Sequence, residues 1–204
     1  MSNNEYSGPV ITISREYGAG GRSIAAALSK ELGIPWYDND FAKRIAEISG
    51  YSEEEVLEEG EEISFQSRVL DKILNNSMAY TSPYDEIFKL QKETIMELAK
   101  NEKPCIIVGR CSNVILRAAG IPSFDVFLFA DKNIRAERAK SLVSGEVTDY
   151  KKYIEKRDAF RKNYYEKYAK ENMEIAIDYN ICLDTGVISY DTCVKTIADI
   201  VRSL

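Results

Sequence analysis

A glycine-rich turn between a predicted strand and a predicted helix is the segment of this sequence best suited to binding an anion. Residues 14–23 read Ser-Arg-Glu-Tyr-Gly-Ala-Gly-Gly-Arg-Ser. They follow a β-branched run at 9–14, which predicts a buried strand, and they lead into a helical pattern that ends at Gly33. The first N–H groups of such a helix have no partners within it, and glycines let a phosphate come close. We therefore expect a phosphate site in this turn, against the simpler alternative of a tight turn that binds nothing.

Two further side chains stand where predicted strands end. Asp38 closes the run 34–38, and Arg110 follows the apolar run 103–109. Open α/β sheets bind ligands at the carboxyl ends of their strands, so both side chains are candidates for a binding site. Each has a simpler alternative, a surface salt bridge for Arg110 and a helix cap for Asp38, although Asp40 fits a cap better. The chain has no histidine, so any chemistry must use carboxylates, arginine, lysine, serine or tyrosine.

The elements that would position these residues alternate between strand and helix. Apolar and β-branched runs predict five strands, at residues 9–14, 34–38, 103–109, 124–130 and 179–183. Helical patterns separate them, and a closing amphipathic helix follows at 190–203. This order predicts an α/β fold, a three-layer α/β/α sandwich with a five-stranded parallel sheet.

Two helical segments stand outside this alternation. Residues 52–101 would be a helical insertion, whose initial acidic run we interpret as a solvated helix face rather than a metal site. Residues 145–172 are charged, and the three- or four-residue spacing of their tyrosines favours packing over base stacking. We predict a single domain, 1–204, with its core at 9–50 and 103–204. Apolar positions of the insertion could support a homodimer, but an intramolecular contact would use them equally well.

Bulk composition excludes several classes of protein. The 204 residues are 45% hydrophobic and 29% charged, which suits a globular domain. A net charge of −6 and a pI near 5.0 argue against nucleic-acid binding. No apolar run approaches the roughly 20 residues that cross a bilayer. Four cysteines without zinc-type spacing, and a polar start unlike a signal peptide, predict reduced thiols and a cytoplasmic location.

The glycine turn and its flanks resemble the P-loop region of bacterial cytidylate kinases. The similar segment reads Val-Ile-Thr-Ile-Ser-Arg-Glu-Tyr-Gly-Ala-Gly-Gly-Arg-Ser-Ile-Ala. The resemblance continues in the same order at residues 36–44, 108–111, 126–131, 135–138, 156–161 and 178–184. It covers most of the chain apart from the insertion, and it is closest to the cytidylate kinase-like group. It implies a P-loop NTPase fold, with residues 145–172 forming a helical lid.

On the donor side, the resemblance implies that the turn binds the phosphates of ATP. The implied nucleotide-binding residues are Gly18, Ala19, Gly20, Gly21, Arg22 and Ser23. Ser23 falls on the loop hydroxyl of the family, which would help to hold Mg²⁺. Arg157 and Arg161 of the lid would neutralise charge on the phosphoryl group in transfer.

On the acceptor side, the resemblance implies a small phosphorylated substrate such as a nucleoside monophosphate. Arg44 and Arg110 would clamp its phosphate, and Asp158 belongs to the Arg-Asp-x-x-Arg set of the lid. Asp38 would face this pocket, and Asn39 stands where a serine would contact the cytosine base.

Two departures from the family pattern bear on activity. The lysine that normally bridges the β- and γ-phosphates falls on Gly21, and the first loop glycine falls on Arg15. Arg15 or Arg22 could supply the missing charge, since a guanidinium can hold phosphate oxygens bidentately. Cys111 replaces an aspartate of the family. Three functions therefore remain open: a nucleoside monophosphate kinase, a nucleotide sensor or pseudokinase without turnover, and a kinase for a non-nucleotide acceptor.

Overall fold

The computed structural model describes residues 6–38, 43, 83–101, 104–143 and 145–204. Its described part contains a parallel sheet with the strand order β2-β3-β1-β4-β5. The strands are β1 (Val10–Arg15), β2 (Trp36–Tyr37), β3 (Ile106–Val108), β4 (Ser123–Phe129) and β5 (Ile181–Asp184). The central strand β1 pairs with β3 on one side and with β4 on the other. The predicted five-stranded parallel sheet is confirmed.

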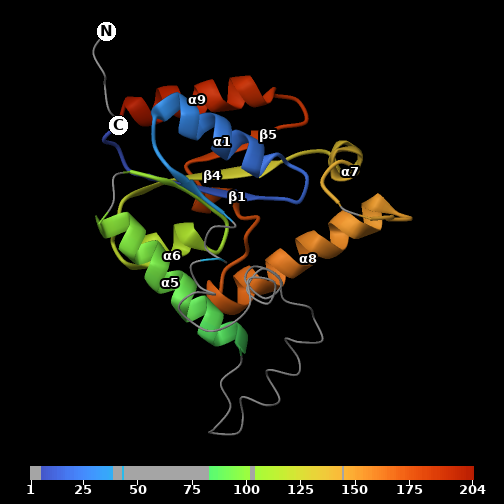
Figure 1. The fold of residues 1–204 in the computed structure, drawn as a ribbon, viewed down its shortest axis with the longest axis horizontal. Coiled ribbons are helices and arrows are strands. Elements are labelled where there is room, and N and C mark those ends of the chain that lie inside the picture. The colour runs from blue at the N-terminus through green and yellow to red at the C-terminus, as the bar shows by residue number, and fades with distance from the viewer. Residues whose placement is uncertain (1–5, 39–42, 44–82, 102–103, 144) are drawn as a thin grey trace, which may run out of the picture.

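Helices cover both faces of the sheet, as Figure 1 shows. The helices α1 (Gly21–Leu32) and α9 (Tyr190–Arg202) lie on one face, and α5 (Pro83–Asn101) and α6 (Ser112–Ala118) lie on the other. Alternate residues of β1 point to opposite sides. Ile11 and Ile13 therefore join the core beneath α1 and α9, whereas Val10 joins the core beneath α5 and α6. The predicted three-layer α/β/α sandwich is confirmed.

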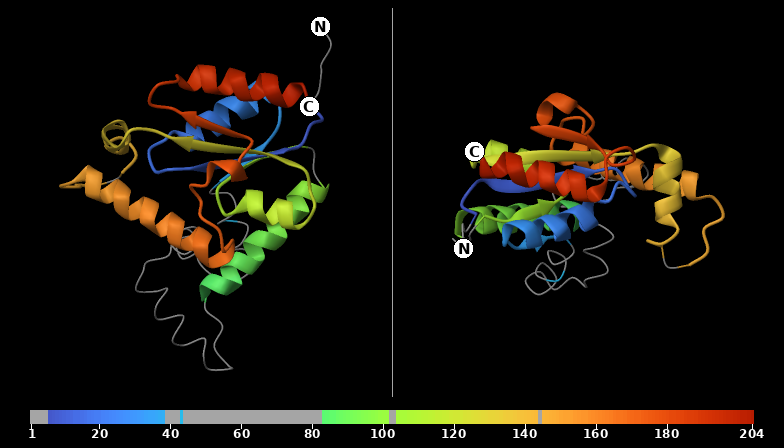
Figure 2. Two further views of the ribbon diagram at one scale, coloured as in Figure 1. Left: turned by 180° about the vertical axis from the view of Figure 1, so that it is seen from behind. Right: turned by 90° about the horizontal axis from the view of Figure 1, so that it is seen from above.

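Two further helices lie beside the carboxyl edge of the sheet. The short helix α7 (Lys132–Ala139) follows β4, and α8 (Tyr150–Tyr168) runs obliquely past the ends of the strands (Figure 2). A 3₁₀ turn, Ala176–Asp178, then leads into β5. The 3₁₀ turn was not predicted.

Most of the predicted acceptor-side insertion, residues 52–82, and the acidic run within it lie outside the described residues, and α5 is its described part. The division of the chain into core, insertion and lid stays a prediction.

Candidate functional site

The glycine turn connects the central strand β1 to α1. Its backbone angles and its close contacts explain why two of its residues are glycines. Gly18 and Gly20 have positive φ angles of 80° and 88°, which side chains rarely adopt. A Cβ on Gly18 would lie 2.7 Å from the carbonyl oxygen of Arg135, and one on Gly20 would lie 2.3 Å from the ring of Tyr190. Gly20 caps α1 without any side-chain hydrogen bond to the helix. The first turn of α1 therefore presents amides that no side chain caps, which is the geometry of an anion site.

Arg135 of α7 stabilises the glycine turn through hydrogen bonds and an ion pair. Arg135 donates from Nε to the carbonyl of Ala130 at 2.9 Å and from Nη1 to the carbonyl of Tyr17 at 3.0 Å. Arg135 also forms an ion pair with Glu16, whose Oε2 lies 3.1 Å from its Nε. Burial raises the pKa of Glu16, and the nearby Arg135 opposes that rise. The turn is thus fixed by buried charges.

A second support comes from the loop after β5. Thr185 donates from Oγ1 to the carbonyl of Ala19 at 2.9 Å, and Arg138 donates to the carbonyl of Thr185 at 2.7 Å. The guanidinium of Arg138 lies 5.0 Å above the ring of Tyr190, the residue that packs against Gly20. Sequence reasoning assigned no role to Arg135, Arg138 or Thr185. The spacing of the two arginines on one face of α7 is the signal that could have found them.

The predicted lid residues of α8 contact the same turn. Asp158 accepts from the backbone N–H of Tyr17 and from Nη1 of Arg135, both at 2.6 Å. The guanidinium groups of Arg157 and Arg161 lie 5.6 and 5.3 Å from the ring centre of Tyr17. The helix α8 is therefore docked on the turn. Asp158 attaches it there, and its predicted contact with an acceptor stays a prediction.

Three arginines converge on Asp38, which follows the end of β2. Its Oδ1 lies 3.4 Å from Nη1 of Arg110 and 3.7 Å from Nη2 of Arg15, while Oδ2 accepts from Nε of Arg22. The side chains of Arg15, Arg110 and Asp38 are buried, whereas that of Arg22 is 62% exposed. Asp38 therefore aligns guanidinium groups from the ends of β1 and β3.

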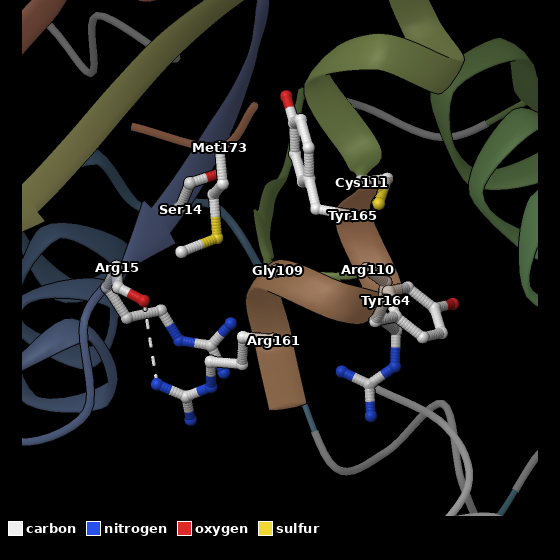
Figure 3. Close-up of a pocket in the computed structure, with 9 residues that line it drawn as sticks. All are labelled: Ser14, Arg15, Gly109, Arg110, Cys111, Arg161, Tyr164, Tyr165 and Met173. Carbon is white, nitrogen blue, oxygen red and sulfur yellow. Dashed lines mark hydrogen bonds between the residues drawn. The ribbon is translucent and has the colours of Figure 1, made fainter. Parts of the chain in front are cut away.

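A small pocket opens beside these arginines. Figure 3 shows Arg15 and Arg161 projecting side by side, with Arg110 on the other side of Gly109. Arg161 donates to the carbonyl of Arg15 at 3.5 Å. Cations from β1, from the turn after β3 and from α8 therefore line one pocket, which is the arrangement a phosphorylated ligand needs.

The backbone that presents Arg110 is unusual. Gly109, Arg110 and Cys111 have successive positive φ angles of 77°, 58° and 53°. A residue with a side chain pays roughly 1–2 kcal/mol in this region, and such conformations concentrate at functional sites. Arg110 is 3% exposed despite its charge. This strain supports a binding function for Arg110.

Tyrosines and a methionine form the other side of the pocket. Asn113 donates from Nδ2 to the hydroxyl of Tyr165 at 2.9 Å, and Tyr179 donates to the carbonyl of Met173 at 2.8 Å. Burial raises the pKa of Tyr179 to about 12 and raises that of Tyr165 as well. The hydroxyl group of Tyr165, which lines the pocket, is therefore uncharged at neutral pH.

The far half of α8 packs against α5. Tyr164 donates to the side chain of Gln91 at 2.5 Å, and Tyr168 stacks on Phe88 with ring centres 4.0 Å apart. Lys167 forms an ion pair with Asp85 at 2.9 Å. One continuous helix thus contacts the glycine turn through Arg157, Asp158 and Arg161 and the described part of the insertion through residues nearer its end.

The donor set of the site suits phosphate better than a protein-bound metal cage. The described residues hold no cluster of three or more Cys, Asp, Glu or His side chains that could bind a metal ion. Ser23 is exposed in the first turn of α1, where its hydroxyl is accessible to a ligand. Phosphate groups fit this arrangement of uncapped amides and converging guanidinium groups. The glycines contribute because a Cβ at their positions would clash with neighbouring atoms. The site therefore fits phosphate groups.

The predicted site residues are distributed as follows. The turn brings together Gly18, Ala19, Gly20, Gly21, Arg22 and Ser23. Arg15, Arg110 and Arg161 line the pocket, and Arg157 lies over Tyr17. Asn39 and Arg44 lie outside the described residues, so their predicted roles have no structural counterpart here.

The described helices include none long and apolar enough to cross a membrane.

The parallel sheet and the glycine turn after its central strand define an α/β fold of the P-loop kinase class. The chain belongs to the cytidylate kinase-like family, whose model matches residues 10–187. A curated cytidylate kinase of Archaeoglobus fulgidus is 24% identical over 188 residues, which cover 92% of this chain and 91% of that protein. The family resemblance seen in the sequence is therefore confirmed.

Solved structures agree with this fold. An uncharacterized protein from Eubacterium ventriosum superposes with a TM-score of 0.66 at 24% identity, covering 96% of this chain and 99% of its own. Shikimate kinase from Acinetobacter baumannii, in complex with shikimate, superposes with a TM-score of 0.56 at 14% identity, covering 97% and 95%. Together, the family and the shared kinase fold indicate a kinase-like phosphotransferase.

Proposed function

We propose that this protein transfers the γ-phosphoryl group of ATP, with Mg²⁺, to a small phosphorylated acceptor, and that the acceptor is a nucleoside monophosphate. The observation that carries the proposal is the pocket in which Arg15, Arg110 and Arg161 meet at the carboxyl ends of β1 and β3, beside the uncapped start of α1. Phosphoryl transfer needs positioning and charge neutralisation more than covalent help, so a set of cations and amides is sufficient machinery.

The two substrates would occupy different parts of this site. The amides of the turn would hold the donor phosphates, with the Ser23 hydroxyl directed to Mg²⁺, which would neutralise charge on the phosphates. Arg110 would hold the acceptor phosphate, and Asp38 would keep the guanidinium groups aligned. In the transfer, the bond between the γ-phosphorus and its bridging oxygen breaks, and a bond to an acceptor phosphate oxygen forms. The products are ADP and the phosphorylated acceptor.

The helix α8 would close the site over the transferring group. Arg157 and Arg161 already lie at the turn, held there by contacts with the ring of Tyr17. Charge in the transition state spreads over the equatorial oxygens of the phosphoryl group, so arginines placed above it stabilise transfer more than binding. We therefore expect Arg161→Ala to lower kcat more than it raises the KM for ATP.

A coupled assay with ATP-Mg²⁺ and CMP, dCMP, UMP or AMP tests this function. We expect turnover with at least one of these acceptors and a large loss in Arg110→Ala. The matched control is Arg117→Ala, because Arg117 is an exposed arginine paired with Glu171 away from the pocket. Absence of turnover with all four acceptors would contradict the nucleoside monophosphate kinase.

Gly21 at the lysine position and Cys111 at an aspartate position favour one alternative, a nucleotide sensor without turnover. Thermal stabilisation by ATP, together with no ADP production from any acceptor, would support that alternative. ADP production with a sugar or other small acceptor, and not with the four nucleotides, would support a kinase for a non-nucleotide substrate.

A further inference from the structure

Gly21 is a glycine without a backbone reason to be one. It is the first residue of α1, and it is absent from the positive-φ residues of the described chain, unlike Gly18 and Gly20. No positive φ angle therefore accounts for this glycine, and the space around its Cα is informative.

The space beside Gly21 is filled by the side chain of Arg15. A Cβ on Gly21 would lie 3.0 Å from Cγ of Arg15, 3.2 Å from Cδ and 3.5 Å from Nε. Contacts of 3.0–3.4 Å are tighter than nine in ten real Cβ contacts, so a side chain at Gly21 requires the Arg15 side chain to shift by a few tenths of an ångström. The aliphatic part of Arg15 thus crosses the start of α1, and its guanidinium enters the pocket (Figure 3).

Arg22, the other arginine of the turn, is placed differently. Its side chain is 62% exposed, and its Nε donates to Oδ2 of Asp38. Arg15 is 6% exposed and lines the pocket together with Arg110 and Arg161. The buried cation beside the usual lysine position therefore comes from the end of β1.

We infer that Arg15 supplies the cation that P-loop kinases supply from the lysine of the loop, and that Gly21 provides the space that Arg15 requires. The chain has exchanged the two positions, since a cation stands where the loop glycine is expected and a glycine stands where the lysine is expected. Arg22 positions Asp38. This inference rests on the proposed function, because it assigns the donor phosphates as the ligand of Arg15.

The position of Arg15 gives its charge a specific use. A guanidinium can bind two phosphate oxygens at once, whereas an ammonium acts as a point charge. Arg161 donates to the Arg15 carbonyl, so the lid arginine is seated against the residue that would hold the donor. Arg15 therefore links the donor phosphates to the docked position of α8.

The inference is tested with variants that remove the cation at position 15, add one at position 21, or do both. Binding of ADP-Mg²⁺ and ATP-Mg²⁺ is measured by calorimetry and thermal shift in the wild type, Arg15→Ala, Gly21→Lys and the double variant Arg15→Gly/Gly21→Lys. We expect each single variant to bind ATP about tenfold to a hundredfold more weakly, because one charged hydrogen bond is lost or displaced. We expect the double variant to bind at least about tenfold more tightly than Gly21→Lys, because removal of the Arg15 side chain gives the lysine the space it needs.

The matched control is Arg202→Ala, since Arg202 pairs with Glu31 on the surface of α9, and this variant should bind like the wild type. Arg15→Ala with wild-type ATP affinity, or a double variant no better than Gly21→Lys, would overturn the exchange. Should Arg15→Ala fail to fold, Arg15→Gln and Gly21→Ala replace the single variants. Gly21→Ala should weaken ATP binding in the wild type and not in the Arg15→Gln background, and equal effects in both would overturn the inference.

The same measurements separate this inference from the proposed function. A wild type that binds ATP but phosphorylates none of the four nucleotides refutes the nucleoside monophosphate kinase, while the binding comparison of the variants still decides the role of Arg15. A wild type with full turnover whose Arg15→Ala variant is unaffected refutes the role of Arg15 and leaves the kinase assignment standing.

Discussion

Two turns at the carboxyl edge of the sheet both adopt positive φ angles, but they differ in whether the residues at those angles have side chains. The turn after β1 adopts positive φ angles at Gly18 and Gly20, where no side chain is present. The turn after β3 does so at Gly109 but also at Arg110 and Cys111, which have side chains. The first turn therefore carries less backbone strain than the second, in which residues with side chains have positive φ angles.

Under the proposed function, the difference follows from what each turn would present to a ligand. The first turn presents backbone amides, so the absence of side chains is useful. The second presents a guanidinium, which glycine cannot provide, so the chain retains the strain of an αL arginine. The first turn is also fixed from outside, by Asp158 and Arg135. Substitutions can therefore distinguish the two turns.

The external support of the first turn gives the largest expected effect. Asp158→Ala removes the buried partner of Arg135 and of the Tyr17 amide, and we expect it to lower the free energy of unfolding by about 3 kcal/mol. Chemical denaturation measures this change. The control Glu171→Ala breaks the exposed pair with Arg117 and should cost less than about 1 kcal/mol. Equal losses in the two variants would show that α8 does not support the turn.

The glycines of the first turn give the next effect. Gly20→Ala forces a side chain into a positive φ and against Tyr190, so we expect a loss of about 2–3 kcal/mol in the free energy of unfolding. Gly33 has a φ of 68°, and a Cβ there would meet no described atom from elsewhere in the chain within 4 Å. Gly33→Ala should therefore show the backbone cost alone, about 1 kcal/mol. Thermal and urea unfolding compare the two. A Gly33→Ala loss as large as that of Gly20→Ala would remove the role of the Tyr190 contact.

The strain of the second turn gives the smallest effect. Arg110→Gly and Arg110→Ala both delete the guanidinium, and we expect the glycine variant to be more stable by about 1 kcal/mol because it relieves the positive φ. At Lys195, an exposed position within α9, the order should reverse, with glycine less stable than alanine by about 1 kcal/mol. Urea unfolding of the four variants gives both differences. An alanine variant as stable as the glycine variant at position 110 would show that the turn carries no strain.

The layers of the fold could be predicted because each element has a local pattern. The β-branched run before the glycine turn, and the helix that Gly33 ends, both follow from neighbouring residues. The contacts of Asp158 with Tyr17 could not be predicted in this way, since 141 positions separate the two residues. The inferred role of Arg15 could not be reached from the sequence either, because the contact between Arg15 and Gly21 exists only once β1 and α1 are placed together.

The central claim is that the first turn binds the donor and the second binds the acceptor. Calorimetric titration of ADP-Mg²⁺ and of CMP into the wild type, Gly20→Ala and Arg110→Ala tests it most directly. The account predicts that Gly20→Ala weakens ADP binding at least about tenfold and largely preserves CMP binding, and that Arg110→Ala does the reverse. Two variants that each weaken both ligands equally would contradict the division between the turns.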